Sequence, residues 1–231
     1  MGCFLFNSID WGKVAEIIAT SIATLAAAYF GAKFAFDMQT RRESAKEMQL
    51  NIDSANVAMF TIRRFRQFFE ALKSSIENDV DPFLQHHLLL KPFSTVNWEY
   101  PQFSYDSLAF LLKGNESVLF NLAALQNDIS STLDITKQRS DMHYSIVQPA
   151  IERIQNEKNG VGVPSDLAII LADKLGPRID ATMENLTEEM KSGIASVIDR
   201  CTIVANQIAT ALETSYPGKV KKRKWSAGSS T

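Results

Sequence analysis

The residues best suited to chemistry are three arginines interleaved with three phenylalanines in the stretch RRFRQFF, residues 63–69. Arginine beside aromatic rings can hold a phosphate or a nucleic acid through charge and stacking. Arg63, Arg64 and Arg66 are therefore candidate contacts for a partner or a phosphate. The alternative is that Phe65 and Phe69 fill a helix seam while the arginines pair with acidic residues of other helices.

A second candidate is the connection 79–103, which holds three prolines and several aromatic residues. A connection of this length exceeds what packing demands, and long loops often carry function. Trp98 and Tyr100 are its candidate binding residues. The alternative is that its aromatic rings cap the open end of a helical bundle.

Metal binding and catalysis find little support in the sequence. Adjacent residues such as His86 and His87 point to different sides of a helix or strand, and with His143 they form no metal-ligand spacing. Cys201 stands in an apolar row, where cysteine acts as an inert small side chain. No nucleophile motif or phosphate-binding glycine loop occurs. We expect no enzyme, no cofactor, no metal and no small-molecule substrate.

Basic residues gather in the tail, residues 217–231. Trp225 follows five cations, which are Lys219, Lys221, Lys222, Arg223 and Lys224. Such a segment docks on anionic lipid, where each charge contributes ~1 kcal/mol, or touches a phosphate backbone. We expect a flexible tail that contacts a membrane surface, and the alternative is a disordered tail that only solvates the chain.

An apolar stretch, residues 14–36, determines where these groups act. It reads VAEIIATSIATLAAAYFGAKFAF, and its only charged residues, Glu16 and Lys33, stand near its ends. A helix of about 20 apolar residues crosses a bilayer, and charges near its ends can reach the interfaces. We predict a transmembrane helix at 14–36. The alternative is a buried helix of a soluble bundle.

The orientation follows from the basic residues around this stretch. Only Lys13 precedes it, whereas Lys33, Arg41, Arg42 and Lys46 lie within it or shortly after it. Positive charge stays on the cytoplasmic side. We therefore predict a protein of the bacterial inner (plasma) membrane, with residues 1–13 as a short tail outside the cytoplasm.

Small residues recur at every fourth position of the predicted span, namely Ala19, Ala23, Ala27, Gly31 and Ala35. Such a row lets two helices approach closely in lipid. We predict self-association of the span, hence a homo-oligomer. The alternative is that alanine is simply common in membrane spans.

Long helices dominate the rest of the chain, because apolar residues keep spacings of three and four. One helix runs from the span to about Asn78, and its seam begins at Ala45. A short helix capped by Ser104 ends near Gly114. Others cover about 115–157, with a bend near Pro149, and about 165–214, with a break at Gly176 and Pro177. We predict an all-α fold, in which the transmembrane helix continues into an elongated antiparallel cytoplasmic helical bundle at 37–216.

The formal net charge of −2 argues against a protein whose main work is to coat nucleic acid. We expect a membrane-anchored helical protein that acts by self-association or by binding another protein, as a scaffold, sensor or regulatory component. One alternative is a membrane effector or toxin whose oligomerising span perturbs the bilayer. Another is a membrane-tethered protein that binds nucleic acid.

Overall fold

The computed structural model describes residues 11–77, 86–94, 98–157 and 166–219. These residues form helices and connections, and they contain no strand. The prediction of an all-α fold is therefore confirmed. The chain divides into two units, Met1–Leu50 and Asn51–Thr231, which we describe separately.

The first helix, α1 (Trp11–Glu77), is 67 residues long and confirms the prediction of one long apolar N-terminal helix. Its sequence contains no proline and only two glycines, Gly12 and Gly31, so little in it breaks a helix. In the first unit, the described side chains beyond Trp11 are exposed, apart from the half-buried Val14 and Met48.

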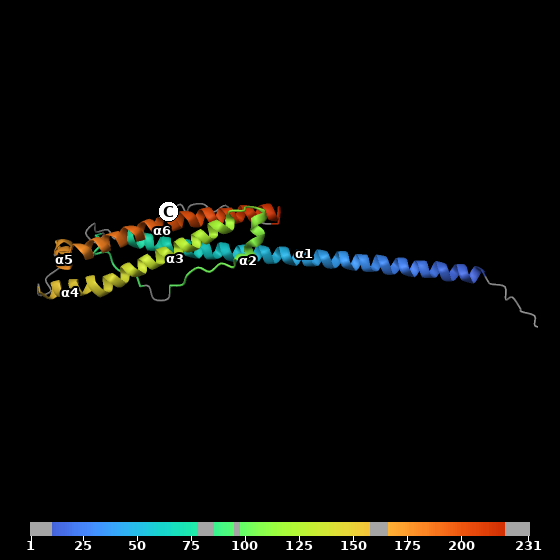
Figure 1. The fold of residues 1–231 in the computed structure, drawn as a ribbon, viewed down its shortest axis with the longest axis horizontal. Helices are drawn as coiled ribbons and strands as arrows, with labels where there is room; N and C mark the ends of the chain where they lie inside the picture. Colours follow the sequence, from blue (N-terminus) through green and yellow to red (C-terminus); the bar gives the residue numbers. More distant parts are fainter. Residues whose placement is uncertain (1–10, 78–85, 95–97, 158–165, 220–231) are drawn as a thin grey trace, which may run out of the picture. The chain divides into compact units, whose positions relative to one another are not determined.

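In the second unit, α3 and α6 lie along the 51–77 part of α1 (Figure 1). The other elements are shorter. In chain order the elements after α1 are α2 (Tyr105–Leu108), the 3₁₀ helix η1 (Ala109–Lys113), α3 (Val118–Met142), the π-helical turn η2 (His143–Val147), α4 (Gln148–Glu157), α5 (Leu167–Leu175) and α6 (Pro177–Ser215).

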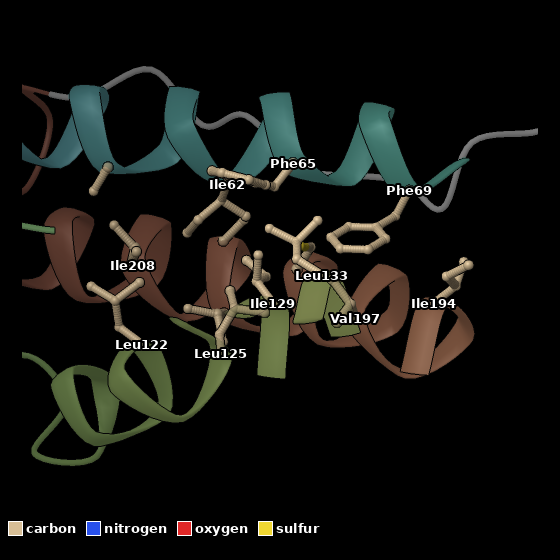
Figure 2. Close-up of a cluster of buried hydrophobic side chains, with 14 of the residues drawn as sticks. Ile62, Phe65, Phe69, Leu122, Leu125, Ile129, Leu133, Ile194, Val197 and Ile208 are labelled. Carbon is tan, nitrogen blue, oxygen red and sulfur yellow. The ribbon is translucent and has the colours of Figure 1, made fainter. Parts of the chain in front are cut away.

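One apolar core joins the three long helices of this unit (Figure 2). α1 contributes Ile62 and Phe69, and each of its core residues lies three or four positions from the next. The predicted seam begins later than expected, because Ala45 is exposed and Ile52 is the first seam residue that packs on the core. In α6, the apolar row predicted by three-to-four spacing from Ile179 to Leu212 is buried from Met183 onward, whereas Ile179 is half-buried.

Side-chain contacts fix the register between α3 and α6. Asn121 donates to Gln207 at 2.9 Å, Asp128 pairs with Arg200, and the Arg139 Nε atom donates to Thr187 at 3.0 Å. Residue numbers therefore rise along α3 as they fall along α6.

Local sequence signals explain the helix ends. Gly176 has a φ of 81°, which favours glycine, and Pro177 opens α6, so the predicted break lies there. Asn115 accepts the Ser117 backbone N–H at 3.0 Å, whereas Ser104 makes no capping bond, contrary to expectation. Where the sequence predicts a bend, the helix contains the π-helical turn η2, which ends two residues before Pro149. A widened turn fits a proline that lacks an N–H.

A second, smaller apolar cluster lies where α4, α5 and the start of α6 meet. Leu88 and Leu89 from the connection before α2 are buried in it, together with Val147, Ile154, Leu167, Ala168, Leu171 and Met183. The neighbouring Leu90 belongs to the main core instead. The segment 86–90 therefore links the two apolar clusters.

The close packing of η1 on α6 gives a direct test of this fold. A Cβ atom on Gly114 would lie 2.6 Å from the Ala211 carbonyl oxygen and 2.8 Å from its Cα, and this backbone cannot rotate away. We expect Gly114→Ala to destabilise the second unit by about 1–3 kcal/mol. Thermal unfolding of the detergent-solubilised chain, followed by circular dichroism, measures the change.

Gly31→Ala is the matched control, because no atom lies within 4 Å of the added Cβ atom. That variant should leave the unfolding temperature unchanged or slightly raised. An unfolding temperature for Gly114→Ala equal to that of the parent would show that η1 and α6 are not this close.

Candidate functional site

The first candidate site is the apolar part of α1. Its large side chains are 53% to 71% exposed, and these are Ile17, Ile18, Ile22, Leu25, Tyr29, Phe30, Phe34 and Phe36. Among the described helices, α1 is the one that is long and apolar enough to cross a membrane, with an 18-residue window of mean hydropathy 1.5 and no buried residue in that window. These side chains are thus not core residues of this chain.

The serine and threonine hydroxyls of this part are satisfied within the helix. Thr20 donates to the Glu16 carbonyl, Ser21 to that of Ile17 and Thr24 to that of Thr20, each at 2.8 Å. Hydroxyls bonded in this way leave no unpaired donor for an apolar solvent to face. The arrangement suits a lipid environment.

The small residues of the predicted association face, Ala19 to Ala35 at every fourth position, are all exposed. A Cβ atom on Gly31 would meet no atom within 4 Å. The face is therefore open to a second helix, and self-association through it stays a prediction.

The structure separates the three candidate arginines of α1. Arg66 is buried and its Nε atom contacts Glu70 at 2.9 Å, while Arg64 pairs with Glu99 at 3.2 Å and Arg63 is exposed. Phe65 and Phe69 are core residues of α1. The arrangement matches the alternative in which the phenylalanines pack and two of the arginines pair with carboxylates.

The structure also brings the two sequence candidates together. Trp98 packs edge-on against Phe68 with ring centroids 5.4 Å apart, and both line a small pocket with Arg64, Phe65, Glu99 and Leu133. Tyr100 donates to Asp134 at 2.5 Å, which joins the connection to α3. These aromatic residues cover the gap between α1 and α3.

The most unusual group in the second unit is Arg139 of α3, which is completely buried. Its guanidinium donates to the Thr187 hydroxyl at 3.0 Å and to the carbonyls of His87, Leu90 and Lys91 at 3.1, 2.6 and 3.5 Å. We call these four bonds the Arg139 clamp. Burial lowers the pKa of Arg139 to about 10. No carboxylate is among its partners in the described residues, and burying a charge in this way is costly.

The clamp holds a turn that also carries two histidines. His87 lies 2.6 Å from the Asp180 carboxylate, and its ring packs beside that of His86 with centroids 4.1 Å apart. The expectation that these two rings point to different sides is therefore wrong, because residues 86–90 form a turn, not a regular helix or strand. Even so, no cluster of three potential ligands in the described part of the chain could hold a metal ion.

His143, the third histidine, is 3% exposed, and neither of its ring nitrogens makes a hydrogen bond. Burial, and next the charge of Arg139, lower its pKa to about 4, while the nearby Leu88 backbone opposes this slightly. The ring is therefore neutral at pH 7. The sequence did not predict that Arg139 and His143 lie against residues 86–91, because no spacing pattern relates positions so far apart in the chain.

The remaining candidates from the sequence are Cys201 and the basic tail. Cys201 is buried, and burial raises the pKa of its thiol to about 12, so it remains an unreactive core residue. Of the basic tail, Lys219 is exposed. Its remaining members, Lys221, Lys222, Arg223, Lys224 and Trp225, lie outside the described residues.

Comparison with known proteins adds no function. No protein-family model matches the chain, and no curated protein or solved structure is significantly similar to it. Its function has to be argued from the arrangement described above.

Proposed function

We propose that this protein is a membrane-anchored helical protein that acts by self-association or by binding another protein, as a scaffold, sensor or regulatory component. The observation that carries the proposal is the exposed apolar part of α1. In it, eight large apolar side chains are exposed, the remaining surface includes a row of small apolar residues, and the serine and threonine hydroxyls are satisfied internally. A helix that is apolar all round is suited to lipid, unlike the one-sided helix of a soluble protein.

The proposed topology puts the N-terminus outside the inner membrane and the remainder in the cytoplasm. It rests on the four basic residues that lie within or shortly after the apolar stretch, against one before it. The second unit is then an elongated antiparallel cytoplasmic bundle. The opposite numbering of α3 and α6 supports this direction of packing.

The described residues give no chemistry that would make an enzyme a better proposal. Nucleic-acid binding is also less well supported, because two of the three candidate arginines are already paired with carboxylates. An interaction role requires only exposed surface. The open row of small residues on α1 and the exposed Val57 and Phe60 provide it.

We expect the double substitution Ile22→Arg and Leu25→Arg to release the protein from membranes. Each arginine at the centre of a span costs about 2.5–3.5 kcal/mol. Membrane pelleting and alkaline carbonate extraction of the full chain measure the change. The control is Phe120→Arg on α3, where a side chain that is 75% exposed can be replaced without affecting the anchor. Equal amounts of the parent and the double variant in the pellet would refute lipid insertion of this helix.

Self-association is tested by Ala27→Leu combined with Gly31→Leu, which enlarges two residues of the open face. The added side chains keep the helices apart, so energy transfer between labelled copies in liposomes should fall at least several-fold. Leu25→Ala, on another part of the helix surface, should leave the signal unchanged. Energy transfer that is unchanged by the substitutions at Ala27 and Gly31 would mean that the copies do not associate through this face.

A further inference from the structure

The chain has three histidines, and all three lie around one turn. His86 and His87 belong to the turn, and His143 faces its backbone at Leu88 from the start of η2. Histidine is the side chain that ordinarily changes charge between pH 5 and 8. The groups that respond to mild acid are therefore concentrated at a single structural feature.

Besides the burial of its three leucines, Leu88 to Leu90, a few polar contacts attach the turn to the rest of the unit. The Arg139 clamp holds three of its carbonyls, and His87 contacts Asp180 of α6. In addition, the Phe93 backbone N–H donates to the Ser140 hydroxyl at 3.1 Å. We call residues 86–93, held in this way, the strap.

Charges of opposite sign lie on the two sides of the strap. α6 presents the carboxylates Asp180 and Glu184 to His86, and Asp180 also contacts His87. On the other side, His143 faces the buried guanidinium of Arg139. The Leu88 backbone lies near the ring and favours its charged form, but it makes no hydrogen bond of ordinary geometry to either ring nitrogen. A proton on His143 would therefore place a second buried cation beside the first.

We propose that the strap is an acid-sensitive latch, which is closed when His143 is neutral and is released from α3 and α6 when His143 takes up a proton. Release lets the imidazolium reach water and relieves its repulsion with Arg139. The three carbonyls and the Arg139 guanidinium are then hydrated, so no polar group is left unpaired. The described residues hold no carboxylate in contact with His143 that would compensate the charge in the closed state.

Release would uncover three leucines at once. Leu88, Leu89 and Leu90 are 0%, 8% and 2% exposed in the closed state. An exposed run of three leucines is a strong apolar contact for a lipid surface or another helix. The latch would thus give the anchored protein an acid-controlled interaction segment.

The direction of the pH effect follows from the pKa of His143, which is about 4 in the closed state against 6.5 for the free side chain. The closed state is fully favoured above pH 6.5, and this preference is lost as the pH falls toward 4. His86 acts in the same direction, because partial burial, and next the charge of His87, lower its pKa. Lowering the pH from 7.5 to 5.0 should increase the open-to-closed ratio by roughly 30-fold through His143 alone.

Hydrogen exchange on the detergent-solubilised full chain measures this ratio. The reporters are the amides of Leu89, Leu90 and Phe93, which are hydrogen-bonded in the closed state. Their protection factors, corrected for the intrinsic exchange rate, should fall by about that factor between pH 7.5 and 5.0. Amides near Leu125 and Ile129 in the α3 core should change by less than about threefold.

His143→Gln should reduce the change at the strap amides to a few-fold, because its side chain takes up no proton. His87→Gln is the comparison variant: it removes a contact of the strap with Asp180 and should lower protection at every pH, but the change between pH 7.5 and 5.0 should remain, because His143 is still present. If His143→Gln proves to be open at every pH, nuclear magnetic resonance of the parent His143 ring decides. The latch requires that ring to titrate below pH 6.5 with a transition that coincides with loss of strap protection.

Either of two kinds of result, in the extent of the change or in its dependence on His143, would overturn the proposal. One is an equal loss of protection at the strap and in the α3 core, which would mean that acid unfolds the whole unit. The other is a pH response that His143→Gln leaves unchanged, or a His143 ring that titrates without any change at the strap amides.

Discussion

The cost of placing apolar side chains in water governs where this protein can reside. Eight large apolar side chains between Ile17 and Phe36 are more than half exposed on α1. Burying one such side chain is worth about 1.5–3 kcal/mol, so leaving all of them in water would forfeit on the order of 10 kcal/mol or more. That is comparable with the whole stability of a typical domain. A lipid bilayer removes this cost without any further protein. The exposed apolar side chains are therefore the reason for proposing a membrane-anchored protein.

In the second unit, a turn with a polar backbone is buried between two apolar clusters and has to be stabilised there. Leu88 and Leu89 enter one cluster and Leu90 the other, so the backbone carbonyls of this turn are drawn into the interior. Arg139 satisfies three of them. A fully buried arginine is a costly solution, and it makes the turn depend on the charges around it. The same arrangement places the buried His143 of η2, whose ring nitrogens make no ordinary hydrogen bond, against this turn.

Much of the fold could be predicted from the sequence, because helix periodicity and helix breakers are local signals. The row from Met183 to Leu212 and the break at Gly176 belong to this class. The start of the seam on α1 was predicted too early, at Ala45, because periodicity does not show where a partner helix begins. The contact of Arg64 with Glu99 and the packing of Phe68 on Trp98 join residues 35 and 30 positions apart, which spacing alone does not reveal.

The Arg139 clamp was not predicted at all, for a physical reason. An arginine in an amphipathic helix is ordinarily a solvated residue, and its carbonyl partners carry no side-chain signature. The stacked His86 and His87 were misjudged because a turn, unlike a helix or strand, can direct neighbouring side chains to one side. Tertiary packing determines such sites. Sequence patterns therefore do not predict them, although the titratable residues of a site can be recognised as candidates.

Thiol labelling at the natural cysteines tests whether α1 crosses the membrane. The chain has only two, and Cys201 is buried with a thiol pKa raised to about 12, so Cys3 is the available reporter. A membrane-impermeant maleimide should label Cys3 in intact spheroplasts. The variant with Cys3→Ser and Ser196→Cys, which places the thiol at an exposed position of α6, should be labelled only after the membrane is permeabilised. Equal labelling of both positions before permeabilisation would show that the helix between them does not cross the membrane.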